Sequence, residues 1–288
     1  MLMNMKELLK IADENKFAVP AFNISDYAML NGIFEACGEK KSPVIIAIHP
    51  DELKHIGIEM VLAIREKAHK ASFPVCIHLD HGQTYEQTIQ AIQAGFTSVM
   101  IDGSTLSFRD NITECKRVVE AAHAAGVSVE GELGTIGSTD SQAETQGNEI
   151  IYTNSDDAVR FVEETGIDTL AIAIGTSHGI YPKGMKPELR LDLLKEIKGK
   201  VSIPLVLHGG SNNRDEEIGE SVKLGISKIN ISSDIKAAYH EKMREVLSDP
   251  GVREPNFIQP ICIAHMKETA YHKIKLFNAE GKASLFKE

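Results

Sequence analysis

The chain has 288 residues, and its 31 Lys and Arg against 41 Asp and Glu give a formal net charge of −10. Hydrophobic residues make up 42% and charged residues 25%, which is typical of globular proteins and too apolar for a disordered chain. The acidic balance argues against nucleic acid or an anionic membrane as the main partner, because both attract a basic surface. No apolar run approaches the roughly 18 residues that a membrane-spanning helix needs.

Short runs rich in β-branched residues alternate with longer helical stretches along the chain. Residues 1–10 carry charges inside an apolar pattern, which predicts an amphipathic helix and not a secretion signal. We then expect eight strands, at residues 19–22, 44–48, 75–79, 98–101, 127–133, 169–174, 205–207 and 228–231. Helices are predicted at residues 58–72, 84–94, 110–125, 156–165, 188–198, 215–224 and 235–247.

The connections between these elements indicate a parallel sheet. Four predicted helices end at a glycine, which supplies the left-handed conformation that returns the chain toward the sheet, at Gly95, Gly126, Gly166 and Gly225. Strands that are apolar throughout imply burial on both faces, as in parallel sheets. Eight strand–helix units therefore predict one (β/α)8 TIM barrel domain over residues 1–288, with an extra C-terminal helix within 254–288. The alternative is an open doubly wound sheet, but no glycine-rich dinucleotide turn follows the first strand.

The cysteines and the longest loop complete this outline. Cys37, Cys76, Cys115 and Cys262 lie far apart without a C-x-x-C pair, which predicts reduced thiols and a cytoplasmic protein. Residues 135–150 form one long connection rich in Gly, Ser, Thr, Gln and acidic residues. Such a loop in a compact domain is typical of a lid over a functional site or of a disordered bulge.

Polar residues follow the ends of the predicted strands, where a (β/α)8 barrel places its chemistry. Three histidines, His81, His178 and His208, come from three different strand ends and should meet at one mouth of the barrel. Three imidazoles with one open position are typical of a catalytic zinc site. His78 lies inside the third strand and is predicted to be a hydrogen-bonded core residue.

Carboxylates stand beside these histidines. Asp80 directly precedes His81, and it is expected either to orient an imidazole or to act as a general acid and base beside the metal. Neighbouring strand residues point to opposite faces, so Asp80 and His81 share a direction only if the strand has ended. Asp102 and Glu132, from the next two strands, are candidate metal ligands or hydrogen-bond acceptors for the ligands.

The last two strands end in small polar residues just ahead of helices. Gly209-Gly210-Ser211 follows the seventh strand, and Ile231-Ser232-Ser233 closes the eighth. Loops after strands seven and eight form the usual phosphate site of this barrel, because backbone N–H groups and helix N-termini attract an anion. We therefore expect a phosphate-bearing small molecule here.

These motifs together resemble the class II ketose-bisphosphate aldolases, of the fructose- and tagatose-bisphosphate type. The resemblance is carried by His-Leu-Asp-His-Gly at 78–82, Gly-Phe-Thr-Ser-Val-Met-Ile-Asp-Gly-Ser at 95–104, Glu-Gly-Glu-Leu-Gly at 130–134, Gly-Thr-Ser-His-Gly at 175–179, Leu-His-Gly-Gly-Ser at 207–211 and Lys-Ile-Asn-Ile-Ser at 228–232. It implies a zinc-dependent barrel enzyme that reversibly cleaves a ketose phosphate into dihydroxyacetone phosphate and an aldehyde. It also implies a homodimer or homotetramer.

The resemblance assigns roles to individual residues. It implies that His81, His178 and His208 bind the catalytic zinc, and that Asp80 exchanges a proton with the hydroxyl at the bond being broken. Asp102 and Glu132 match a second cation position, divalent or monovalent. Residues matched to substrate binding are Gly179, Lys183, Gly209, Gly210, Ser211, Asn230, Ile231, Ser232 and Ser233. Asn23 and His49, which follow the first two strands, and Lys236, near the end of the eighth, are further substrate-binding candidates by position alone. A class I mechanism is disfavoured, because Lys228 is expected to begin its strand at the end opposite the site.

The chain departs from the family pattern at several positions. Its second strand ends in His49, where bisphosphate enzymes usually carry a small hydroxyl residue. Asn212-Asn213 follows the Gly-Gly-Ser turn, where many members have glycine. The catalytic glutamate of the lid corresponds most nearly to Asp140, with Glu144 as the other candidate. Residues 257–262 lack the arginine that relatives often supply to the second phosphate.

These departures predict that the dihydroxyacetone phosphate half of the site is kept and the aldehyde half is altered. The aldehyde is then glyceraldehyde 3-phosphate or one without a phosphate, and Lys236 is the residue that could still contact an acceptor phosphate. Two other functions are weighed against an aldolase. One is a metal-dependent sugar-phosphate isomerase on the same barrel, and the other is a catalytically weak sugar-phosphate-binding protein.

Overall fold

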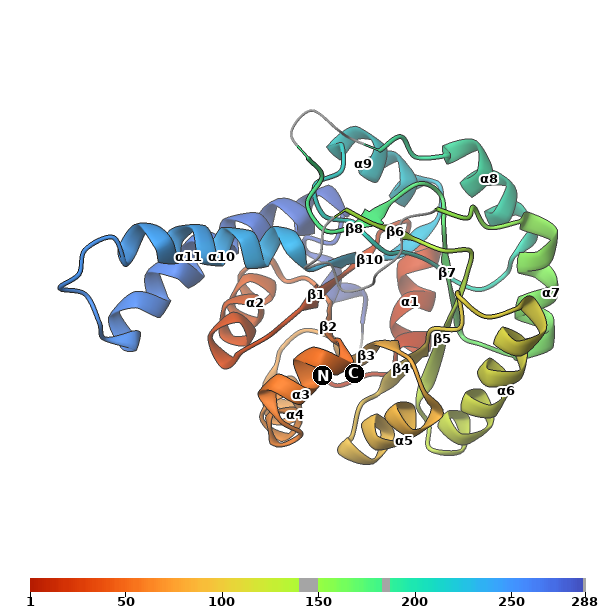
Figure 1. Ribbon diagram of the computed structural model, residues 1–288, viewed down its shortest axis with the longest axis horizontal. Helices are drawn as coiled ribbons and strands as arrows, with labels where there is room; N and C mark the ends of the chain where they lie inside the picture. The colour runs from red at the N-terminus through yellow and green to blue at the C-terminus, as the bar shows by residue number, and fades with distance from the viewer. Residues whose placement is uncertain (140–149, 183–186, 287–288) are drawn as a thin grey trace.

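Eight parallel strands close into a barrel, as the sequence predicts (Figure 1). The computed structural model describes residues 1–139, 150–182 and 187–286. The barrel strands are β1 (Val19–Asn23), β2 (Val44–Ile48), β3 (Val75–Gly82), β4 (Ser98–Ile101), β5 (Ser128–Leu133), β7 (Thr169–Ile172), β9 (Leu205–Leu207) and β10 (Ile226–Ile231). Around the barrel their order is β1-β10-β9-β7-β5-β4-β3-β2, and every neighbouring pair is parallel.

Helices surround the barrel, and each predicted helix has a counterpart (Figure 1). Positive φ angles at Gly95, Gly126, Gly166 and Gly225 agree with the predicted turns back into the sheet. The outer helices are α2 (Tyr27–Lys40), α3 (Pro50–Ile56), α4 (Glu59–Lys70), α5 (Tyr85–Ala94), α6 (Phe108–Ala124), α7 (Ser155–Thr165), α8 (Leu191–Lys200), α9 (Asp215–Lys223) and α10 (Ser233–Val246). Neither α2 nor the short α3 is among the predicted helices.

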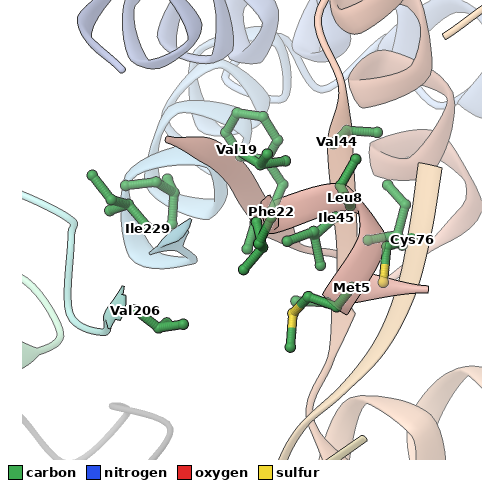
Figure 2. Close-up of a cluster of buried hydrophobic side chains, with 14 of the residues drawn as sticks. Met5, Leu8, Val19, Phe22, Val44, Ile45, Cys76, Val206 and Ile229 are labelled. Atoms are coloured by element: carbon green, nitrogen blue, oxygen red, sulfur yellow. The ribbon is translucent and has the colours of Figure 1, made fainter. Parts of the chain in front are cut away.

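The N-terminal helix closes one end of the barrel. This helix, α1 (Met5–Glu14), begins four residues later than predicted, because Asn4 caps it by accepting a hydrogen bond from the Glu7 N–H. The Met5 N–H donates to Ser128 Oγ at the amino end of β5, 2.9 Å away. Figure 2 shows Met5 and Leu8 in one buried cluster with side chains of β1, β2 and β3. With one end filled by α1, the carboxyl ends of the strands are left for a site.

The predicted C-terminal helix is present as α11 (Pro255–Leu276), followed by the 3-10 turn η1 (Lys282–Leu285). It packs against α10 and α2, and in Figure 1 α10 and α11 form a hairpin that projects from the side of the barrel. Within the described residues, no helix has both the length and the apolar composition needed to cross a membrane. All four cysteines are buried free thiols, as predicted.

A two-stranded sheet sits at the carboxyl end of the barrel. The sixth predicted strand, 169–174, ends earlier, at Ile172, and the chain forms strand pairing again only at Ser177. There β6 (Gly137–Ser138) lies parallel to β8 (Ser177–His178), and Thr139 donates from its N–H and its Oγ to the His178 carbonyl, at 2.9 and 2.8 Å. The first residues of the predicted lid are therefore bonded to the backbone of a predicted zinc ligand.

Candidate active site

The three predicted zinc ligands meet at the mouth of the barrel. A nitrogen atom from each of His81, His178 and His208 lies within 4.8 Å of the other two, and all three residues are buried. The ring centre of His81 is 5.0 Å from that of His178 and 4.5 Å from that of His208. The structure thus brings together side chains from β3, β8 and the end of β9.

Backbone geometry at His81 explains how two adjacent residues serve the same site. Strand β3 continues to Gly82, so the alternation of faces would separate Asp80 from His81. His81 instead has a left-handed φ of +51°, and the pairing of β3 with β4 shifts register between Leu79 and Gly82. This irregularity lets both side chains reach the mouth.

In both His81 and His208, one ring nitrogen bonds to a carboxylate, and the other points to the centre of the three histidines. The His81 Nδ1 lies 2.8 Å from Asp102 Oδ2, which leaves Nε2 as the inward atom. The His208 Nε2 lies 2.7 Å from Glu130 Oε1, which leaves Nδ1. These two inward nitrogens are 2.8 Å apart, and the buried His178 Nε2 has no hydrogen-bond partner. Three converging imidazole nitrogens fit Zn²⁺.

The charges around the rings also favour a cation. Burial opposes protonation of His81, yet Asp80, Asp102 and Glu132 raise its pKa to about 10. Burial and the neighbouring Asp102 raise the pKa of Glu132 well above its usual value, and the buried Glu132 Oε2 has no hydrogen-bond partner. His81, Asp102 and Glu132 form a second group that could hold a metal ion. A divalent ion would offset the excess of carboxylates.

Asp80 is held between two asparagine side chains from β1 and β10. The Asn23 Nδ2 donates to Asp80 Oδ2 at 2.9 Å, and the Asn230 Nδ2 donates to Oδ1 at 2.8 Å. Burial opposes ionisation of Asp80, but His81, His208 and Lys228 lower its pKa well below the usual value. The Oδ1 atoms of Asn23 and Asn230 are buried and have no hydrogen-bond partner, so both can accept hydrogen bonds from hydroxyl groups of a substrate.

A pocket lies beside the three predicted zinc ligands, over the ends of β9 and β10. It is lined by His178, Gly179, Gly209, Ser211, Asn230, Ser232 and Ser233. Gly209 has a φ of +62°, and a Cβ there would stand 2.7 Å from the Ser177 carbonyl oxygen. Gly210 and Ile231 do not line this pocket, and the Ile231 side chain belongs to the hydrophobic core. The predicted phosphate residues are otherwise brought together.

The remaining predicted residues are His49, which follows β2, Lys236 on α10, and three that lie outside the described residues. His49 is buried and caps α3, with Nδ1 accepting from the Asp51 N–H and Nε2 left without a partner. Burial lowers the pKa of His49, which favours a neutral ring with the proton on Nε2. Lys236 forms an ion pair with Glu52, 2.5 Å away. Lys183, Asp140 and Glu144 lie outside the described residues.

One sequence prediction about this region is wrong. Lys228 does not begin its strand, because β10 starts at Ile226 and Lys228 is its third residue. Its side chain is fully buried, and its Nζ lies 2.8 Å from Glu130 Oε2. The sequence did hold a signal for this placement. Lys228 stands two residues before the site residue Asn230, and strand residues two apart point to the same face.

Other contributors were also missed. Glu52 holds Lys236, and Tyr181 holds the segment that carries His178: its hydroxyl accepts from the Ser177 N–H at 2.6 Å and donates to the Ser177 carbonyl at 3.2 Å. Neither residue stands in a motif. The partner of Glu52 is distant in sequence, and the partner of Tyr181 lies in the two-residue strand β8.

Comparison with known proteins places this chain in a family. A family model described as fructose-bisphosphate aldolase class-II matches residues 3–282. The YdjI aldolase of Escherichia coli K12 is 33% identical, with a TM-score of 0.87 over 98% of this chain and 100% of that chain. A protein assigned as a fructose-1,6-bisphosphate aldolase from Coccidioides immitis is 27% identical, with a TM-score of 0.90 over 98% and 99%. Fructose-bisphosphate aldolase from Campylobacter jejuni, 23% identical with a TM-score of 0.83 over 98% and 97%, shares the fold.

Proposed function

The chain belongs to the class II fructose-bisphosphate aldolase family and is a lyase, and on that premise we propose that it uses Zn²⁺ to cleave a ketose monophosphate into dihydroxyacetone phosphate and an aldehyde without a phosphate. Members of this family are generally zinc-dependent. The observation that carries the proposal is the convergence of nitrogens from His81, His178 and His208 within 4.8 Å of one another. When bound there, Zn²⁺ would supply a Lewis acid that stabilises negative charge on the ketone oxygen.

The residues around the zinc ligands divide the remaining work. Asp80 is assigned the proton of the hydroxyl next to the bond that breaks, because it is ionised and is held in place by Asn23 and Asn230. The Oδ1 atoms of these asparagines, which have no hydrogen-bond partner in the protein, accept hydrogen bonds from hydroxyl groups of the sugar. Asp140 or Glu144, outside the described residues, is assigned the second acid and base, as the family resemblance implies.

The phosphate of the product binds over β9 and β10. Gly179, Gly209 and Ser211 bring backbone N–H groups and a hydroxyl to the pocket, and Ser232 and Ser233 stand at the N-terminus of α10. Together these groups favour a phosphate dianion through hydrogen bonds and the helix dipole. Lys183 is assigned a further contact to the same phosphate.

The far end of the sugar is assigned to the region beside Asp80. His49 offers a buried, unpartnered Nε2 there, which suits a hydroxyl or carbonyl oxygen. Lys236 is the predicted contact for a second phosphate, but its charge is balanced by Glu52 at 2.5 Å. A neutral His49 ring and a lysine already paired with a carboxylate favour an uncharged, hydroxylated aldehyde over one that carries a phosphate.

The first experiment tests the reaction. Purified protein treated with excess chelator should lose activity in an assay coupled to dihydroxyacetone phosphate, and added Zn²⁺ should restore it. Activity that survives chelation would contradict the zinc role. Interconversion of two ketose phosphates without release of a three-carbon product would support an isomerase, and tight sugar-phosphate binding without turnover would support a binding protein.

The second experiment tests the substrate class. Steady-state kinetics on matched ketose 1-phosphates and 1,6-bisphosphates should give the higher kcat/KM with the monophosphates. A clear preference for fructose or tagatose bisphosphate would overturn this part of the proposal while leaving the aldolase itself in place. Light scattering would test the homodimer or homotetramer that the family resemblance implies.

A further inference from the structure

A buried chain of polar side chains runs through the barrel interior to one zinc ligand. Lys228, Glu130, His78 and His208 are all fully buried. The Lys228 Nζ lies 2.9 and 2.8 Å from the two carboxylate oxygens of Glu130 and 3.3 Å from His78 Nε2. Glu130 Oε1 also lies 2.7 Å from His208 Nε2. None of these contacts involves the pocket over β9 and β10 or the asparagines that hold Asp80.

The direction of each hydrogen bond follows from the lysine. An ammonium group can only donate, so His78 accepts on Nε2 and carries its proton on Nδ1, which donates to Ser98 Oγ at 2.9 Å. Burial lowers the pKa of His78 to about 3, in agreement with a neutral ring. Lys228 also donates to both oxygens of Glu130. Glu130 is left as a pure acceptor, and His208 must donate to it from Nε2.

We propose that Lys228 and Glu130 are positioning residues that hold His208 with Nδ1 directed at the metal, so that this buried ion pair contributes to zinc affinity. The inference rests on the proposed zinc function. An ion pair placed only for stability would gain little over apolar side chains of similar size, because desolvation offsets the attraction. A carboxylate that binds the outer nitrogen of a ligating histidine instead orients the ring, and loss of such a partner typically weakens metal binding by about 10–100-fold.

The test is a double variant that removes both charges together, Lys228→Met with Glu130→Gln. Neither charge is left buried alone, and the glutamine amide can either accept from His208 or donate to it, so the orientation of the ring is no longer enforced. We expect the zinc dissociation constant, measured by competition with a chelating indicator, to rise by about 10–100-fold. The visible spectrum of the Co²⁺-loaded variant should differ from that of the wild type.

The matched control is Lys198→Met, which removes a lysine paired with Asp13 at 2.8 Å near the amino end of the barrel. Its zinc dissociation constant should stay within about twofold of the wild-type value, although its melting temperature falls. A folded double variant with zinc affinity and a Co²⁺ spectrum like the wild type would overturn the inference. Wild-type protein that does not bind zinc would instead contradict the proposed function.

A measurement on the unmodified protein decides the question if the double variant does not fold. Nitrogen-15 NMR of the histidine rings in the zinc-loaded wild type should show His208 with a proton on Nε2 and metal on Nδ1. His78 should carry its proton on Nδ1. Metal on the Nε2 of His208, or a proton on the Nε2 of His78, would contradict the hydrogen-bond directions on which the inference depends.

Discussion

The ammonium of Lys236 lies 2.5 Å from the carboxylate of Glu52, across the gap between α10 and α3. Glu52 also accepts from the His49 N–H at 2.9 Å and from the Ser25 hydroxyl at 3.1 Å. One carboxylate therefore caps α3, fixes the backbone of His49 and balances the charge of Lys236. This arrangement offsets the charge of the lysine that is the predicted contact for a second phosphate.

Glu52→Gln tests whether that balance sets substrate preference. The glutamine can keep the helix cap, while Lys236 loses its ion pair with Glu52, which should strengthen its attraction for a second phosphate. We expect the kcat/KM for a ketose bisphosphate to rise by about tenfold relative to the monophosphate, or about 1.4 kcal/mol. Glu59→Gln, at an exposed position on α4, is the control. An unchanged ratio in Glu52→Gln would show that Lys236 does not face the acceptor.

Asp80→Ala tests proton transfer at the bond that breaks. The carboxylate contacts Asn23 and Asn230, while the nitrogens proposed to bind zinc belong to the three histidines, so metal should be retained. We expect kcat to fall by about 10²–10⁴-fold, the usual contribution of a general acid or base. Metal analysis and steady-state kinetics on the same sample are the measurement. Turnover near the wild-type rate would remove Asp80 from the mechanism.

Gly209→Ala tests the shape of the phosphate pocket. A Cβ at this position would stand 2.7 Å from the Ser177 carbonyl oxygen, in addition to the strain of a φ of +62°. Because Ser177 precedes His178, we expect KM for the sugar phosphate to rise by about tenfold or more. Gly126→Ala is the matched control, since it has a φ of +71° but no atom within 4 Å of a new Cβ. It should cost only about 1–2 kcal/mol of stability, with KM unchanged.

Tyr181→Phe tests how strand β8, which carries His178, is held. Removal of the hydroxyl leaves the buried Ser177 N–H without its acceptor, which should cost about 1–3 kcal/mol of unfolding free energy. Zinc affinity should fall by about tenfold as His178 loses its support. Tyr239→Phe provides the contrast, because the Tyr239 hydroxyl is buried without a hydrogen-bond partner and its loss should cost nothing. Equal effects of the two variants would argue against a role for Tyr181.

Much of the site could be predicted from local sequence. Apolar runs separated by helices and closed by glycines indicate parallel strands, and in such a barrel the residues after each strand share one mouth. That rule alone brings His81, His178 and His208 together from positions almost 130 residues apart. The same rule gathers the residues of the predicted phosphate pocket.

The tertiary structure decided what local patterns could not. Alternation along a strand places Asp80 and His81 on opposite faces, and only the left-handed backbone at His81 joins them. The partners of Lys228 and Lys236 are Glu130 and Glu52, 98 and 184 residues away. The charge that a lysine presents depends on which carboxylate the closed barrel packs against it. Sequence determined which side chains reach the mouth, because strand direction is local, whereas folding determined which of them are already paired.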